Sequence, residues 1–153
     1  PASGKERTML LLSKLDKVEK IKEGSVLANA IQGATKLLKN RSLVFVISDF
    51  RSTGWEEPFK LLAQKNDVVA LRVTDTFDFE LPDMGSVPFV DSETGISCVL
   101  PTSTEGLKSA WKEDFKYRTQ KWKDFCIRHG ASPLSISTEE DVVRVLSSFF
   151  LGN

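Results

Sequence analysis

The sequence predicts an α/β fold with three layers, in which a mostly parallel sheet lies between helices. Two short apolar runs, 43–47 and 68–73, each end in polar residues, as strands that are buried on both faces do. The helical pattern of 55–65 separates the two runs, with short connections on either side. A strand, a helix and a strand joined in this way form a βαβ unit, which requires parallel strands.

Length and composition indicate a single domain, 1–153, with one core. Hydrophobic residues make up 41% of the chain and charged residues 27%, which is ordinary for a globular protein. Lys and Arg (21) balance Asp and Glu (21), so a basic nucleic-acid binder is disfavoured. No apolar stretch is long enough to span a bilayer and no signal-peptide pattern is present. We therefore expect a cytoplasmic protein whose segment here does not contact a membrane. Because the chain begins with Pro1, we also expect it to be a piece of something longer.

Two helices precede the first strand. Apolar residues within 9–18, set between lysines and an arginine, predict an amphipathic helix. Ser25 then opens a second helix as its N-cap, and the apolar stripe of this helix extends to Leu38. The central strand, 43–48, follows almost at once.

The chain then continues as a loop at 51–54 and a short helix at 55–65. Pro58 fits this helix only in its first turn, where no backbone hydrogen bond is lost. The second strand, 68–73, comes next and ends in Thr74, after which the periodicity changes.

The last part of the chain predicts a hairpin, a long helix, a strand and a final helix. Segments 86–90 and 96–100 are expected to pair as a β-hairpin outside the main sheet. The long helix covers 104–129, and a short strand at 133–136 joins the parallel sheet. Ser-Thr-Glu-Glu at 137–140 has the pattern of a capping box at the start of the final helix.

Carboxylates follow both parallel strands, Asp49 after the first and Asp75 after the second. The carboxyl ends of parallel strands meet at the edge where open α/β sheets bind ligands. With Ser48, Thr74 and Ser25, these oxygens could hold Mg²⁺ or serve a phosphoryl-transfer enzyme. The alternative is that each Asp is a turn or cap residue, and for Asp75 this is preferred. No glycine-rich phosphate loop accompanies the pair.

The long helix carries basic and acidic residues in alternation. A mixed-sign face is usually solvated and contains i,i+4 ion pairs, such as Asp114 with Arg118. An anion-binding surface on this helix is the weaker alternative. Its aromatic stripe, Trp111, Phe115 and Trp122, is expected to belong to the core.

The cysteines, Cys98 and Cys126, are far apart and lack metal-ligand spacing, so we expect buried, reduced thiols. His129 is the only histidine, which leaves at most one imidazole for a zinc site or a catalytic triad. The sequence therefore contains no pattern that predicts a catalytic group or an organic cofactor.

Four segments of the chain, taken in order, resemble the sequence pattern of one family. They are 43–50 (LVFVISDF), 66–75 (NDVVALRVTD), 79–85 (FELPDMG) and 91–95 (DSETG). The sequence resembles the C-terminal half of the domain-of-unknown-function fifty-eight family, a von Willebrand factor A-like group. The opening residues, 1–5, are similar to the family's segment after its third strand, so the resemblance covers essentially the whole chain.

The resemblance implies a Rossmann-like, von Willebrand factor A-like sheet flanked by helices, incomplete here because its N-terminal strands are absent. It also implies a metal-ion-dependent adhesion site on the carboxyl edge of that sheet. By position Asp49 matches the site's last Asp, and Ser25 falls where the family has a Thr. The upstream Asp-x-Ser-x-Ser loop is absent from this chain. The half-site is therefore expected to bind Mg²⁺ weakly or not at all.

The function implied by the resemblance is that of a non-enzymatic protein-interaction module. Such proteins are commonly encoded beside MoxR-type AAA+ ATPases, which implies an adaptor or chaperone partner of such an ATPase. Its site would take a carboxylate from another protein through a bound cation. The alternative is a Mg²⁺-dependent phosphoryl-transfer or hydrolytic enzyme that uses Asp49 and Asp75, with Arg51 as the one obvious cation.

The missing strands have a physical consequence for 43–47. This segment would become an edge strand with unpaired backbone groups, an apolar face and no proline or inward charge. We expect the 153-residue chain to self-associate. The alternative is that another segment of the same protein covers the edge.

Overall fold

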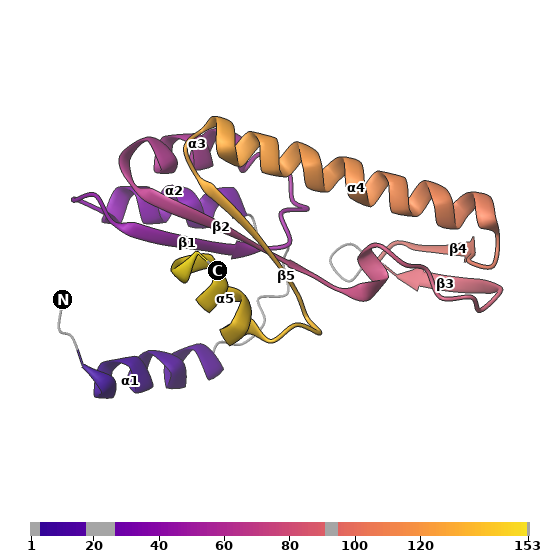
Figure 1. The fold of residues 1–153 in the computed structure, drawn as a ribbon, viewed down its shortest axis with the longest axis horizontal. Helices are drawn as coiled ribbons and strands as arrows, with labels where there is room; N and C mark the ends of the chain where they lie inside the picture. Colours follow the sequence, from indigo (N-terminus) through magenta and orange to yellow (C-terminus); the bar gives the residue numbers. More distant parts are fainter. Residues whose placement is uncertain (1–3, 18–26, 91–94, 153) are drawn as a thin grey trace.

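The computed structural model describes residues 4–17, 27–90 and 95–152, and these form a parallel sheet with helices on both faces (Figure 1). The elements in chain order are α1 (Lys5–Asp16), α2 (Leu27–Leu37), β1 (Leu43–Ser48), α3 (Glu56–Lys65), β2 (Asp67–Thr74), the 3₁₀ helix η1 (Thr76–Asp78), β3 (Ser86–Val90), β4 (Ser97–Pro101), α4 (Glu105–Arg128), β5 (Ser132–Ser137) and α5 (Val142–Leu151).

The main sheet has the strand order β1-β2-β5, and all its pairs are parallel. Its register places Val46 beside Ala70. The predicted strands at 43–48, 68–73 and 133–136 are therefore confirmed, and so is their parallel arrangement. Because the three strands run the same way, their carboxyl ends meet at one edge. We call this edge, with the loops that follow β1 and β2, the rim.

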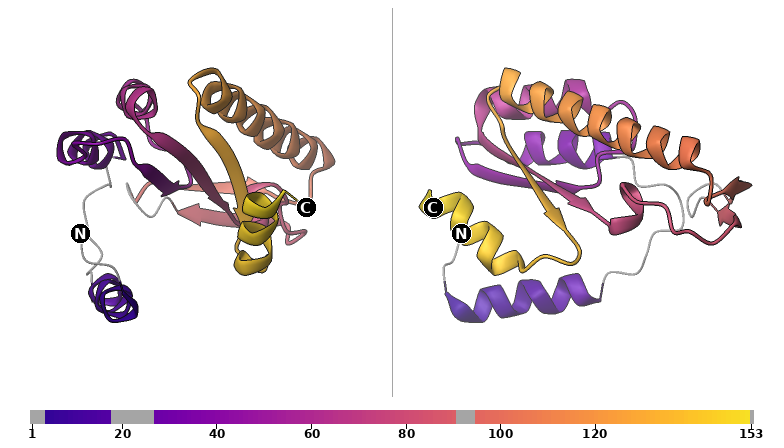
Figure 2. Two further views of the ribbon diagram at one scale, coloured as in Figure 1. Left: turned by 60° about the vertical axis from the view of Figure 1, so that its left-hand side comes forward. Right: turned by 45° about the vertical axis from the view of Figure 1, so that its right-hand side comes forward.

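The core lies between the sheet and the helices α2, α3 and α4, which cover one face (Figure 2). Pro58, which is buried, lies in the first turn of α3 as predicted, and Phe59 and Leu62 beside it are fully buried. The core cluster consists of Ile31, Val46, Trp55, Phe59, Leu62, Ala63, Val68, Ala70, Trp122, Cys126 and Ala131. Burial of these apolar side chains is the main stabilising contribution to the fold.

The opposite face of the sheet is covered by α5, and only in part (Figure 2). Phe150 of α5 lies over Phe45 of β1, with 6.0 Å between the ring centroids. The neighbouring side chains on this face of β1 remain open to solvent, since Leu43 is 56% and Ile47 64% exposed. The prediction that this strand is buried on both faces is therefore wrong, because no described element covers most of its second face. In the described ranges β1 is also an outer strand of its sheet, which confirms the predicted edge.

The hairpin forms where it is predicted, with β3 and β4 antiparallel and outside the main sheet. Helix α4 extends beyond the sheet toward this hairpin (Figure 1). Lys108 of α4 is 3.1 Å from Asp83, and Lys112 is 3.8 Å from Glu80. The ELPDMG segment thus joins the long helix to the chain after β2 through ion pairs.

The structure confirms the ion pair predicted on α4 and only part of its predicted aromatic core stripe. Arg118 and Asp114 form the expected i,i+4 ion pair, at 2.7 Å. Trp122 is buried in the core, whereas Trp111 is half-buried and donates its indole N–H to the Phe77 carbonyl at 3.1 Å. The stripe is therefore core only in the half of α4 that lies over the sheet.

The start of the final helix corrects the prediction. We expected 137–140 to cap it, but α5 begins at Val142 and its N-cap is Asp141. The box at 137–140 does form its hydrogen bonds, but it closes a turn. The reason is that the Thr138 N–H donates to the Thr74 carbonyl at 2.9 Å, so sheet-like pairing continues past β5.

The prediction of two buried thiols is half correct. Cys126 is fully buried, and its burial raises the thiol pKa to about 12, so it is protonated and unreactive at neutral pH. Cys98 is exposed. It lies on β4 of the hairpin, and a two-stranded sheet outside the main sheet is too small to bury the side chains on both of its faces.

Helix α1 is present where predicted, but the apolar residues 9–12 do not reach the core. Met9, Leu10, Leu11 and Leu12 are each 55–61% exposed. Four consecutive residues spread around a helix instead of forming one stripe. In the part of the chain that the structure describes, no helix is both long and apolar enough to cross a bilayer.

Candidate functional site

The rim after β1 is a tight double turn made by Ser48, Asp49 and Phe50. Ser48 Oγ accepts the N–H of Phe50, and Asp49 Oδ1 accepts the N–H of Arg51, each at 3.1 Å. Short polar side chains form such bonds with the backbone two residues on. Phe50 has a φ of 55°, a left-handed conformation that costs an L-residue energy. Its ring returns to the core, 5.0 Å from Trp55.

Asp49 is placed where the predicted metal site requires it, at the carboxyl end of β1. Its Oδ1 accepts hydrogen bonds from Ser48 Oγ and the Arg51 N–H, and its Oδ2 accepts none from any residue that the structure describes. The turn therefore holds the carboxylate with one oxygen available to a ligand.

The rest of the predicted metal site is not assembled on the described rim. Ser25, the second predicted ligand, lies outside the described residues. Among residues 4–17, 27–90 and 95–152, no three Asp, Glu, His or Cys side chains are grouped closely enough to hold a metal ion. Mg²⁺ requires near-octahedral oxygen coordination and gives up its water reluctantly. One carboxylate and one hydroxyl do not meet that requirement, so the described donors do not fit a resident Mg²⁺.

We therefore expect calorimetric titration of the 153-residue chain with Mg²⁺ to give no saturable binding, or only weak binding. The physical reason is that most of the octahedral shell would remain water. Tight, stoichiometric binding that Asp49→Ala abolishes would contradict this expectation.

Asp75, the second carboxylate on the rim, acts as a cap. Its Oδ1 accepts the Phe77 N–H at 3.0 Å and its Oδ2 accepts the Thr138 hydroxyl at 3.0 Å. Asp78 completes a capping box by accepting the Asp75 N–H at 2.9 Å. Both oxygens of Asp75 are engaged in holding η1 and the turn after β5. This is the role that the sequence favours for Asp75.

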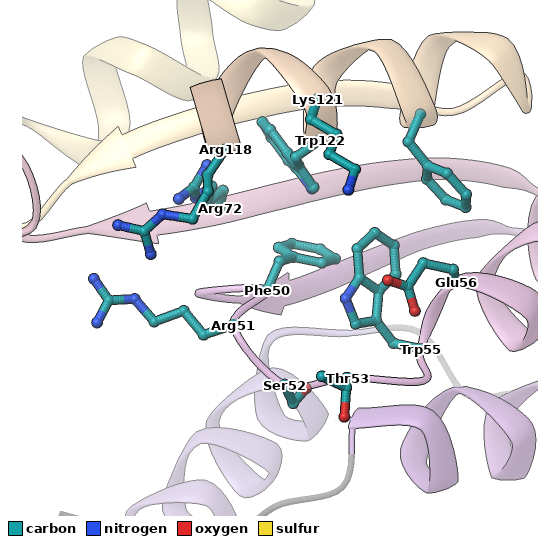
Figure 3. Close-up of a pocket in the computed structure, with 11 residues that line it drawn as sticks. Phe50, Arg51, Ser52, Thr53, Trp55, Glu56, Arg72, Arg118, Lys121 and Trp122 are labelled. Carbon is teal, nitrogen blue, oxygen red and sulfur yellow. The ribbon is translucent and has the colours of Figure 1, made fainter. Parts of the chain in front are cut away.

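A pocket of about 380 Å³ adjoins the rim, between the loop that follows β1 and the middle of α4 (Figure 3). Its charged lining residues are four cations and one carboxylate: Arg51, Arg72, Arg118, Lys121 and Glu56. Its aromatic lining residues are Phe50, Trp55, Trp122 and Phe125. The same double turn that presents Asp49 also places Phe50 and Arg51 in this pocket.

Arg72 is the most unusual of these residues, because it belongs to β2 and is only 4% exposed. It donates to Thr119 Oγ1 at 3.0 Å, and its guanidinium carbon lies 5.5 Å from the Phe115 ring centroid and 5.7 Å from that of Trp122. Burial is the largest cause that lowers the pKa of Arg72, followed by the like charges of Arg118 and Arg51. A guanidinium still remains protonated at neutral pH, so this is a buried positive charge.

Only some residues of this site could be predicted from the sequence. The sequence interpretation placed Asp49 and Arg51 on the rim, but it assigned Arg118 and Lys121 to a solvated helix face. It also treated Arg72 as an ordinary member of an apolar strand. The available signal was a lone cation inside a strand otherwise buried on both faces, since charged residues are rarely fully buried without a partner.

Comparison with known proteins identifies relatives of similar sequence, and those reported below are described as uncharacterized. An uncharacterized protein of Mycobacterium avium is 38% identical over 72 residues, covering 46% of this chain and 43% of that protein. Uncharacterized proteins of Mycobacterium bovis and Mycobacterium tuberculosis are 30% identical over 131 residues, covering 80% of this chain and 40% of theirs. The chain thus spans less than half the length of these relatives. No solved structure matches it.

Residues 1–121 match the family described as "Protein of unknown function DUF58". This match covers the strand and turn of the rim, the ELPDMG segment and most of α4. It confirms the predicted resemblance to this family over residues 1–121, whereas we expected it over essentially the whole chain. The chain belongs to the DUF58 family.

Proposed function

We propose that the chain is a protein-interaction module of the von Willebrand factor A type, whose rim receives a carboxylate of a partner protein. The observation that carries this proposal is the state of Asp49, which is held by the double turn with Oδ2 free of hydrogen bonds in the described structure. In this role Asp49 would supply one ligand of a shared cation. The other ligands would come from outside the described ranges, where Ser25 lies, or from the partner.

The partner that we propose is a MoxR-type AAA+ ATPase, for which the chain would act as an adaptor or chaperone. The support for this is membership of the DUF58 family, together with the adhesion-site resemblance at Asp49. Arg51, whose backbone N–H donates to Asp49, carries a positive side chain that would favour an acidic surface on that partner, although it also pairs with Asp78.

The test uses the full-length protein that contains this chain and the MoxR-type ATPase of the same organism, in buffer with Mg²⁺. We expect the two to form a complex in sedimentation velocity, and we expect Asp49→Ala to weaken it by about tenfold or more, as loss of a charged interface group does. Asp124→Ala is the matched control, since that exposed carboxylate belongs to α4 and not to the rim, and contacts Gln120. Equal binding by wild type and Asp49→Ala would contradict the proposed role of the rim.

Activity assays on the same full-length protein distinguish this proposal from the enzyme alternative. A phosphoryl-transfer enzyme based on Asp49 and Asp75 would need both carboxylates for metal or substrate, and the two oxygens of Asp75 are already hydrogen-bonded. Phosphatase and nucleotide-hydrolysis assays with Mg²⁺ measure this activity directly. Metal-dependent turnover that Asp49→Ala removes would overturn the interaction proposal in favour of the enzyme.

A further inference from the structure

We propose that the pocket between the loop after β1 and helix α4 binds a small anionic ligand, a carboxylate or phosphate carried on a flat apolar body. This site is separate from the proposed adhesion role of Asp49 and does not rest on it. The reasons are the charge of the lining, two buried donors without acceptors, and the aromatic walls (Figure 3).

The charge of the lining is strongly unbalanced. Four cationic side chains face one carboxylate, that of Glu56. Arg51 pairs with Asp78 and Arg118 pairs with Asp114, so their charges are partly compensated from outside the pocket. Neither Arg72 nor Lys121 forms an ion pair with any residue in the described ranges. Asp78 and Asp49 partly offset the Arg72 charge from outside the pocket. Four cations facing one carboxylate in a concave site still favour an anion.

Two buried N–H donors of the lining have no acceptor within the described structure. They are Nε of Arg72 and Nε1 of Trp122. The Nε of Arg118 is also buried without a hydrogen bond, but it lies 2.7 Å from Asp114 Oδ2 in an ion pair. Buried donors are rarely left unpaired in folded proteins, and a buried charge without a partner is more costly still. Neither atom is reached by solvent in this structure, so an oxyanion in the pocket would pair with them only after the lining side chains shift. An Arg guanidinium also matches carboxylate and phosphate geometry better than any other side chain.

The aromatic walls indicate what carries the anion. Trp55 lies edge-on to Phe50 at 5.0 Å and to Phe125 at 5.1 Å, and Trp122 lies 5.5 Å from Phe50. These rings form a fixed apolar surface directly beside the cations. The volume, about 380 Å³, is within the usual range for small-ligand sites. A bare inorganic ion would leave this surface unused.

Titration with four probes tests the inference: phenyl phosphate, phenylacetate, its neutral amide phenylacetamide, and inorganic phosphate. Trp55 and Trp122 line the pocket and Trp111 does not, so a Trp111→Phe variant makes tryptophan fluorescence a local reporter. We expect phenyl phosphate or phenylacetate to bind at least about tenfold more tightly than phenylacetamide and inorganic phosphate. The tighter of the two anions identifies the oxyanion class. Binding should weaken as salt is raised.

Matched variants on α4 localise the binding. Lys121→Gln removes a lining cation, whereas Lys116→Gln removes the same charge from a solvent-exposed position of the same helix outside the pocket. We expect Lys121→Gln to weaken anion binding by about fivefold or more and Lys116→Gln to leave it nearly unchanged. Arg72→Gln should have the largest effect. Should that buried variant fail to fold, Arg118→Gln and Lys121→Gln still decide the question.

Three results would overturn the inference. One is the absence of binding by either aromatic anion, and another is equal binding of phenylacetate and phenylacetamide. The third is anion binding that Lys121→Gln and Lys116→Gln change equally, since this would place the anion on the general surface of α4 and not in the pocket.

Discussion

Replacement of Phe59 by alanine is expected to lower the free energy of unfolding by roughly 3–5 kcal/mol. Phe59 is fully buried in the first half of α3. Its ring packs edge-on against Trp55 at 5.5 Å and contacts Phe125 at 6.0 Å and Phe50 at 6.3 Å. The substitution loses the transfer energy of the ring and leaves a cavity at the junction of α3, α4 and the rim.

Chemical denaturation followed by circular dichroism measures this change. Leu61→Ala is the matched control, because Leu61 lies on the same helix and is 52% exposed. Its expected cost is under about 1 kcal/mol, as for most surface substitutions. If the two variants lost similar stability, the arrangement of the core against α3 would be wrong. Because Phe50 and Trp55 also line the pocket, Phe59→Ala should weaken anion binding as well.

Self-association of the 153-residue chain is the second large effect that we expect. Strand β1 is an outer strand in the described sheet, and Leu43 and Ile47 on its open face are 56% and 64% exposed. An apolar edge strand presents unpaired backbone groups that can pair with another chain. Proteins usually blunt such edges with lysine, proline or a bulge. Segment 43–47 has no lysine or proline, and its residues pair one to one with β2 without a bulge.

Sedimentation velocity over a concentration series measures the association. We expect the wild-type chain to form dimers or larger species, and Ile47→Lys to shift it toward monomer by placing a charge on the open face of the edge. Val99→Lys is the control, since Val99 is 67% exposed on the separate hairpin. A strictly monomeric and cooperatively folding wild-type chain would contradict the prediction.

Local patterns in the sequence were enough to determine the strands, most of the helices and the turn at the rim. The apolar run of β1 and the nearly apolar run of β2 identify the two strands, and the short link between them requires parallel pairing. Burial on both faces holds for β2 and not for β1, whose outer face is open. Ser48 and Asp49 form a turn through bonds to the backbone two residues on, so their role is local as well. These features depend on residues within a few positions of one another, which is the distance over which periodicity and turn chemistry act.

The tertiary structure alone decided what surrounds each side chain. Arg72 belongs to a strand and Lys121 to a helix, and they share a pocket only because α4 returns across the sheet after the hairpin. The 137–140 segment has the residues of a helix cap, yet sheet pairing at Thr138 holds it as a turn. The exposure of Cys98 follows in the same way from its place on a two-stranded hairpin outside the main sheet. Burial, charge pairing and ligand geometry depend on contacts between segments far apart in the chain. The spacing of residues within one segment does not predict those contacts.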